Sequence, residues 1–176
     1  PQVLSAHGYD TALIGKSHVQ TFTNIPAPIG KNPLGNGPLT NAVNIGDESM
    51  YRQEDPVVWK KKGRNALQTP YYGYGHVDLV TFHGDMTGAS HGVWLREQTD
   101  KLDQLRGAKN QLPHDYTCSQ AIRTALPEEL YSTSYIKNCT QTYLSDAARQ
   151  DKPFFAFVSF PDPHHPFTPP GPWFDR

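Results

Sequence analysis

The stretch PFFAFVSF at residues 153–160 is almost wholly apolar and aromatic, and PDPHHP follows it directly at residues 161–166. A continuous apolar run of this length is typical of a β-strand that lies at the centre of a sheet and is buried on both faces. Pro153 fits such a strand because it stands at the first position. The prolines that follow fix the backbone and exclude both helix and sheet, so we expect His164 and His165 to be held on a stiff loop at the strand's end.

Two earlier segments are predicted to be strands as well. Residues 11–14 (TALI) are a compact apolar run bounded by Gly8 and Gly15, and residues 77–82 (VDLVTF) follow a segment rich in turn residues. Polar or titratable side chains come directly after both strands, and they are Lys16, Ser17, His18 and His83.

Helices are expected around these strands. Residues 92–106 place their apolar side chains close to one helical face, and residues 134–149 repeat apolar residues at helical spacing, with Ser132 or Thr133 as the expected cap. Residues 1–7 are expected to be the end of a helix. The alternation of strands and helices predicts an α/β fold, in which a mostly parallel central sheet is flanked by helices and ligands bind at the carboxyl ends of the strands.

A long segment without periodicity follows the first strand. Residues 19 to about 56 show neither a helical nor a strand period and are interrupted repeatedly by proline and glycine. We therefore interpret residues 19–70 as a loop-rich insertion within a single domain that spans residues 1–176. Loops of this length often serve as lids or binding segments, and disorder or a subunit contact is an equal alternative here.

The composition argues against several classes of partner. Lys and Arg number 16 against 17 Asp and Glu among 176 residues, a balance that favours neither nucleic acid nor an anionic membrane. No apolar run of about 18 residues is present, so we expect a soluble protein without a spanning helix. The N-terminus shows no secretory signal, which we attribute to truncation, and the compartment stays open. Cys118 and Cys139 could form one bridge, but two free or buried thiols are favoured.

Two segments carry a resemblance to a known family. Residues 8–18, GYDTALIGKSH, resemble the second signature of the sulfatases, a Gly-Tyr-x-Thr-x-x-x-Gly-Lys-x-His stretch, and every element of it is present. Residues 154–170 are similar to the family's strand followed by Pro-His-x-Pro, and residues 72–96 look like its bacterial sulfatase and phosphonate monoester hydrolase branch. The resemblance covers most of the chain outside residues 19–70. It implies a partial alkaline-phosphatase-like sandwich and the hydrolysis of small-molecule sulfate esters by an arylsulfatase-like enzyme.

The resemblance also implies roles for individual residues. Lys16 matches the signature lysine that contacts the sulfate, and His18 matches the histidine that holds the hydroxyl of the nucleophile. His164 matches the histidine near the bridging ester oxygen, where an imidazolium can protonate the leaving group. His83 and His165 are further candidates for binding the substrate. A hydrogen-bonded or packing role is the simpler interpretation of both histidines. For Lys16 without its flanking motif, the simpler interpretation would be a charge exposed to solvent.

Other expected parts of a sulfatase are missing from this sequence. The family forms a formylglycine nucleophile from a Cys/Ser-x-Pro/Ala-x-Arg motif upstream of the signature, but only seven residues precede Gly8. The stretch that begins at Cys118 departs from that motif in its third position and in the spacing of its arginine. The calcium or other divalent cation of the family is held by Asp-Asp and Asp-Asn or Asp-His pairs, and neither pair is recognised here. We therefore assign no metal ligand in this chain and expect an internal fragment that is inactive alone.

Several alternatives stay open at this point. The same scaffold in this family also serves phosphonate monoester and phosphodiester hydrolases. A non-catalytic module could use Lys16, His18 and His164 only to bind an anion. A transition-metal site built from the eight histidines is a further hypothesis, although no His-x-x-x-His or Cys-x-x-Cys spacing supports it. Because a central strand without neighbours exposes aromatic surface, we also expect the chain to aggregate, to form a homo-oligomer or to pair with additional polypeptide.

Overall fold

The structure is a computed structural model that describes residues 1–20 and 51–175. Residues 21–50, which form much of the expected insertion at 19–70, lie outside the described residues. The regular elements, in chain order, are α1 (Gln2–Ala6), β1 (Asp10–Lys16), α2 (Pro56–Lys62), β2 (His76–Thr81), α3 (Ala89–Gln98), α4 (Leu102–Leu105), α5 (Ser132–Ala147) and β3 (Phe154–Ser159). Short 3-10 helices lie at Gly63–Ala66, Gly84–Met86, Ala108–Asn110, Glu128–Leu130 and Gly171–Trp173.

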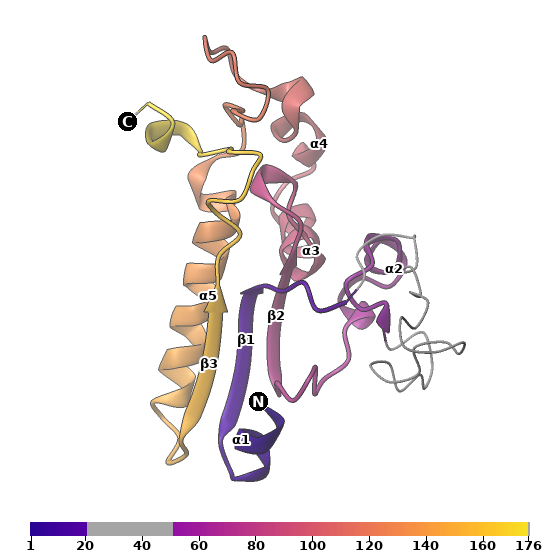
Figure 1. Cartoon of the computed structure of the whole chain (residues 1–176), viewed down its shortest axis with the longest axis vertical. Helices are drawn as coiled ribbons and strands as arrows, with labels where there is room; N and C mark the ends of the chain where they lie inside the picture. The colour runs from indigo at the N-terminus through magenta and orange to yellow at the C-terminus, as the bar shows by residue number, and fades with distance from the viewer. Residues whose placement is uncertain (21–50, 176) are drawn as a thin grey trace, which may run out of the picture.

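The three strands form one parallel sheet in the order β2-β1-β3. In Figure 1 they stand side by side and point the same way, so that their carboxyl ends meet at one edge of the sheet. Helices flank the sheet, which confirms the predicted α/β class with a parallel central sheet. All three predicted strands are confirmed within a residue or two of their expected bounds.

The central strand β1 is buried because its side chains alternate between two apolar layers. Ala12 and Ile14 pack against α5 in a cluster that includes Ile136, and both residues are fully buried. Leu13 points to the other layer, where it packs against Trp59 from α2. The other buried residues of that layer are Ala66, Tyr71, Leu79 and Ala89. The two layers explain why this short apolar run has no polar member between Thr11 and Gly15.

The position of β3 differs from the expectation of a central strand. β3 pairs with β1 along one side and forms an edge of the described sheet. Its aromatic side chains are exposed, with Phe154 at 43% and Phe157 at 46% relative exposure. A continuous apolar run therefore does not tell a central strand from an edge strand. Nothing in the described part of the chain covers the exposed side chains of β3.

Two helix predictions need correction. The single helix expected at residues 92–106 is broken into α3 and α4, because Thr99 is extended and its Oγ1 accepts a hydrogen bond of 3.1 Å from the backbone N–H of Lys101. The helix expected at residues 134–149 begins two residues earlier, at Ser132, and neither Ser132 nor Thr133 caps it with its side chain. The helix end expected at residues 1–7 is confirmed as α1.

The described part of the expected loop-rich insertion contains regular structure. Asp55 caps α2, since its Oδ1 accepts a hydrogen bond of 2.8 Å from the backbone N–H of Val57, and Pro56 takes the first helical position. The indole of Trp59 then anchors the helix by donating to the Gln53 carbonyl at 2.6 Å. Cys118 and Cys139 are both free thiols, as favoured from the sequence.

Candidate functional site

Lys16, Ser17 and His18 lie where β1 ends, at the carboxyl edge of the sheet. Lys16 is half-buried, Ser17 is buried and His18 is exposed. Burial lowers the pKa of Lys16, and the negative charge of Glu54 opposes that effect. The β1 backbone approaches β3 closely just before this point: a Cβ built on Gly15 would lie 1.9 Å from the carbonyl oxygen of Ser159. Gly15 therefore allows the ends of β1 and β3 to lie side by side.

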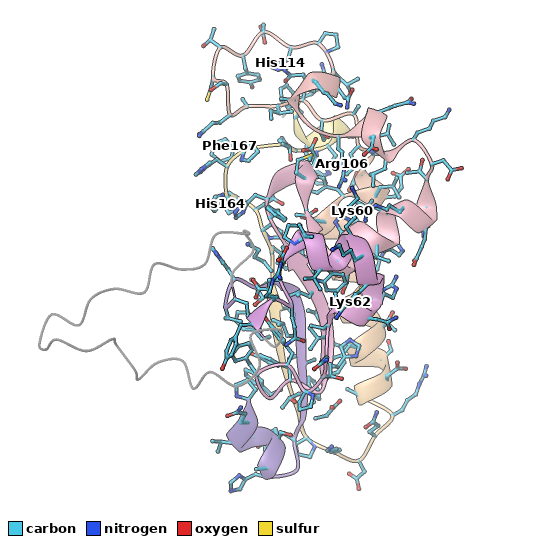
Figure 2. All side chains as sticks on the ribbon, turned by 90° about the vertical axis from the view of Figure 1, so that its right-hand side faces the viewer. Lys60, Lys62, Arg106, His114, His164 and Phe167 are labelled. Carbon is cyan, nitrogen blue, oxygen red and sulfur yellow. The ribbon has the colours of Figure 1, made fainter. Side chains whose placement is uncertain are left out.

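The segments that follow β2 and β3 also contact each other. His83 follows β2, and its ring stacks on the ring of His164, with centroids 3.6 Å apart and planes inclined by 11°. The next residue, Gly84, lies directly against the loop after β3, since a Cβ there would approach Thr168 Oγ1 to 2.8 Å. The ring of His165 lies 4.4 Å from that of His164. Figure 2 shows His164 and Phe167 on the same side of the ribbon, on the loop after β3.

The electrostatic surroundings of His83 include the other four candidate side chains. The pKa of His83 is lowered to about 4, first by burial and then by the positive charges of Lys16, His164, His165 and His18. Such an effect requires those groups to lie near the imidazole, because charges in partly solvated positions act only over short distances. His83 is therefore neutral at neutral pH and sits among groups that carry, or can acquire, positive charge.

The hydrogen bond of His164 shows which of its ring nitrogens carries the proton in the neutral form. Its Nδ1 lies 2.6 Å from the backbone carbonyl oxygen of His165, so Nδ1 carries the proton and donates. The Nε2 atom is then the nitrogen that gains or loses a proton. His164 can therefore present an acceptor or, when protonated, an N–H donor without turning its ring.

The loop that carries His164 is tied to the start of α5. The Tyr131 hydroxyl donates to Asp162 Oδ1 at 3.0 Å and shares a hydrogen bond of 2.9 Å with Thr168 Oγ1. Tyr131 and Thr168 are both buried, so these bonds hold the two ends of the loop against one helix. The prediction of a stiff loop after β3 agrees with these contacts.

Sequence reasoning missed Glu54, which lies beside this group. Glu54 is fully buried and accepts hydrogen bonds from Ser17 and from the backbone N–H of Val19, both at 3.0 Å. It comes from a stretch without periodicity, far along the chain from β1. Only its acidic character within a turn-rich segment could have been noted, and that is a weak signal.

The remaining histidines considered from the sequence lie elsewhere or are structural. His91 is fully buried, its Nδ1 pairs with Thr87 Oγ1 at 2.8 Å and its Nε2 with the Leu130 carbonyl at 3.0 Å. Burial lowers the pKa of His91 to about 4, so it is neutral and serves the core. His76 lies at the start of β2 and bonds to Asp78 Oδ2 at 2.8 Å, which raises its pKa.

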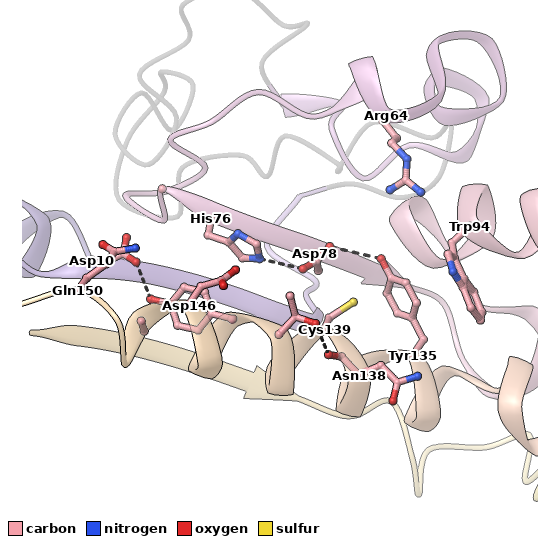
Figure 3. Close-up of a pocket in the computed structure, with 14 residues that line it drawn as sticks. Asp10, Arg64, His76, Asp78, Trp94, Tyr135, Asn138, Cys139, Asp146 and Gln150 are labelled. Atoms are coloured by element: carbon pink, nitrogen blue, oxygen red, sulfur yellow. Dashed lines mark hydrogen bonds and ion pairs between the residues drawn. The ribbon is translucent and has the colours of Figure 1, made fainter. Parts of the chain in front are cut away.

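A cavity of about 730 Å³ lies away from the candidate site, between β2 and α5. Some of its polar side chains pair with one another: His76 with Asp78 at 2.8 Å, as Figure 3 shows, and the Tyr143 hydroxyl with Asp10 at 3.0 Å. Such mutual pairing satisfies the polar groups without a ligand. The size of this cavity is therefore a weaker guide to function than the charges gathered at the carboxyl ends of the strands.

Neither a cluster of metal ligands nor a membrane-spanning helix is present among the described residues. Across residues 1–20 and 51–175, no group of three or more His, Cys, Asp or Glu side chains is arranged to hold a metal ion. The described residues therefore offer no ligand set for the calcium implied by the resemblance, nor for the transition-metal hypothesis. In the part of the chain that the structure describes, no helix combines the length and apolar character needed to cross a membrane.

This arrangement has a definite chemical capacity. One lysine and several imidazoles converge on one side of the sheet edge, and such groups bind the oxygens of a sulfate or phosphate by charge-assisted hydrogen bonds. His164 can in addition move a proton at Nε2. Comparison with models of protein families, with curated proteins and with solved structures gave no match for this chain.

Proposed function

We propose that this chain is part of a hydrolase that cleaves sulfate esters and that the group at the strand ends holds the sulfate. The observation that carries the proposal is the meeting of the strand ends: Gly15 lets the end of β1 lie against Ser159 of β3, and the ring of His83, after β2, stacks on that of His164 at 3.6 Å. Lys16 ends β1 and His18 follows it two residues later, whereas His164 comes from the loop after β3, far along the chain. The resemblance of residues 8–18 and 154–170 to sulfatase motifs adds support that does not depend on the geometry.

Each side chain has a distinct task in this proposal. Lys16 offsets negative charge that develops on the sulfate oxygens, an effect that is strongest where water is partly excluded. His164 gives a proton from Nε2 to the leaving oxygen, a contribution usually worth about 10²- to 10⁴-fold in rate. His18 holds the hydroxyl of the nucleophile, and His83 and His165 complete the wall around the anion.

The nucleophile and the divalent cation are proposed to come from residues outside this sequence. The family's formylglycine would supply the attacking oxygen, and its calcium would stabilise charge on the sulfate. No residue of this chain is assigned to either group. On this proposal the chain by itself binds the anion and does not turn over an ester.

A cavity beside the loop after β3 bears on the organic part of the ester. It measures about 470 Å³ and is lined largely by apolar side chains, among them Tyr131, Phe167, Pro169 and Trp173. The loop that carries His164 also provides Pro163, Phe167 and Pro169 to this cavity. We therefore propose an apolar or aryl group as the organic part of the ester, with a phosphonate or phosphate diester of similar shape as the alternative substrate.

Binding of inorganic sulfate tests the proposal directly. The Lys16→Ala and His164→Ala variants are each expected to lose about tenfold to hundredfold in affinity, because a hydrogen bond to a charged group contributes about 1.5–3 kcal/mol. Lys60→Ala and His7→Ala are matched controls, since both residues are exposed and lie away from the strand ends. Calorimetry or histidine NMR shifts would measure the affinities. Equal losses in the control variants, or wild-type chain that binds no sulfate, would refute the site.

Turnover by the complete gene product decides between the two ester classes. An aryl sulfate and an aryl phosphonate with the same leaving group should be compared at equal concentration. A kcat/KM that favours the sulfate supports the proposal, and one that favours the phosphonate supports the alternative. Sulfate binding without turnover of either ester would identify a non-catalytic anion-binding protein.

A further inference from the structure

We propose that Glu54 is a positioning residue of the anion site, holding the segment from Lys16 to Val19 in place and facing Lys16 with a buried negative charge. The inference rests on the proposed anion site and assigns to it a residue from outside the strand ends. Nothing in the sequence motifs points to Glu54.

The contacts of Glu54 join two separate parts of the site's surroundings. Its Oε1 accepts hydrogen bonds from Ser17 Oγ and from the backbone N–H of Val19, both at 3.0 Å. The same oxygen accepts from the hydroxyl of Tyr71 at 2.6 Å, and Tyr71 precedes β2. Because Ser17 and Val19 flank His18, these bonds fix the backbone that carries both Lys16 and His18.

The segment around Glu54 is itself firmly held. The backbone N–H of Gln53 donates to Gln20 Oε1 at 2.7 Å, and the carbonyl of Gln53 accepts from the Trp59 indole at 2.6 Å. Glu54 and Asp55 are both fully buried. A rigid support of this kind is what a positioning residue needs, because a mobile carboxylate would not fix its partners.

The charge of Glu54 is incompletely compensated by its hydrogen bonds. Oε2 is buried and has no hydrogen-bond partner among the described residues. A buried carboxylate in that condition is costly unless a positive charge acts on it. Lys16 supplies that charge: it precedes Ser17, whose hydroxyl donates to Glu54 at 3.0 Å, and Glu54 opposes the lowering of the Lys16 pKa by burial.

The other titratable groups at this corner of the site are four imidazoles and the phenol of Tyr71, whose pKa is raised by burial and by Glu54, so that it stays neutral at neutral pH. His18 follows β1, His83 follows β2, and His164 and His165 follow β3, and all of them interact electrostatically at His83 together with Lys16. Within the described ranges, Glu54 is the acidic side chain that acts on Lys16. Its removal should therefore make Lys16 easier to deprotonate.

The variant Glu54→Gln separates charge from geometry. Glutamine keeps an oxygen that can accept from Ser17, Val19 and Tyr71, but it carries no charge. We expect the pKa of Lys16, measured by NMR of selectively labelled lysine, to fall by about one unit, the smaller end of what an opposite charge at close range contributes. Sulfate affinity should then be lost at correspondingly lower pH, whereas affinity at neutral pH should be kept.

The variant Glu54→Ala removes both functions, and Asp55→Asn is its matched control. Glu54→Ala should lose about tenfold in sulfate affinity at neutral pH, because the segment after β1 loses its acceptor. Asp55 is an equally buried carboxylate that caps α2 and pairs with Arg52, so Asp55→Asn should reduce stability and leave the Lys16 titration unchanged. If Glu54→Ala does not fold, Ser17→Ala is used in its place, because it removes one of the three hydrogen bonds to Glu54.

The outcomes distinguish this inference from the proposed function. An unchanged Lys16 titration in folded Glu54→Gln overturns the role of the charge, and neutral-pH affinity unchanged in Glu54→Ala overturns the role in positioning. If wild-type chain binds no sulfate, the proposed function fails, while the Lys16 titration in the absence of any anion still decides whether Glu54 acts on it.

Discussion

Replacing Gly15 by alanine should be the most damaging small substitution in the sheet. The φ of Gly15 is +109°, and a Cβ at this position would lie 1.9 Å from the carbonyl oxygen of Ser159 and 3.2 Å from Ile136 Cδ1. A backbone carbonyl within a ladder cannot move aside as a flexible side chain would. The substitution must therefore either strain Gly15 or push β3 away from β1.

The cost can be estimated from these two effects. A left-handed backbone costs a non-glycine residue about 1–2 kcal/mol, and overpacking of a core typically costs about 1–3 kcal/mol. Together they predict a loss of about 2–5 kcal/mol, a large part of the about 5–15 kcal/mol that stabilises an ordinary domain. Because Lys16 is the next residue, separation of β1 from β3 should also weaken sulfate binding.

Urea unfolding followed by tryptophan fluorescence measures this loss, and Gly8→Ala provides the control. Gly8 also has a positive φ, of +85°, but a Cβ there would meet nothing within 4 Å. Gly8→Ala should therefore cost only the backbone term, about 1 kcal/mol. If both variants unfold at the same urea concentration, the contact with Ser159 does not limit position 15 and the reasoning is wrong.

Three further predictions concern stability and association. Burial of neutral His91 contributes up to about 3 kcal/mol of stability, which is complete above the unfolded pKa of about 6.5 and is lost as pH falls toward the folded pKa of about 4. The stability of His91→Gln, measured by urea unfolding, should therefore depend less on pH over this range. An equal pH dependence in the variant would contradict the assignment. Tyr131→Phe should cost about 1–3 kcal/mol in the same assay, because Asp162 and Thr168 lose a buried partner, and a cost near zero would show that the loop is held otherwise. The chain should self-associate through the exposed aromatic edge strand, and Phe157→Lys should reduce that association in analytical ultracentrifugation; a wild-type chain that is monomeric at every concentration would exclude it.

The strands could be predicted because their signals are local. The apolar residues between Gly8 and Gly15 and the run after Pro153 have few alternatives to a strand, and short connections to polar residues mark their ends. Parallel pairing then places Lys16, His83 and His164 at one edge, whatever the details of the loops. This is why candidate residues from three distant segments could be named together.

The features that were missed depend on contacts that leave no local pattern. The break at Thr99 depends on one side-chain bond to the Lys101 backbone, which competes with the helix. Whether β3 is central or at an edge depends on what covers it, and its own composition does not contain that information. Glu54 reaches Ser17 across 37 positions of sequence, and a single acidic residue in an aperiodic segment does not indicate such a partner.

The order β2-β1-β3 has a consequence for how the chain folds. β1 pairs with β2 and with β3, and its partners in β3 lie more than 140 positions along the chain, as for Asp10 and Phe154. Parallel pairing over such separations is slow, because closing the long intervening loop costs entropy before any contact is gained. During synthesis β1 and β2 can pair early, whereas the pairing of β1 with β3 must wait until residues 154–159 have emerged. A chaperone that protects nascent β1 would therefore be expected to raise the yield of folded chain more than one that acts after release.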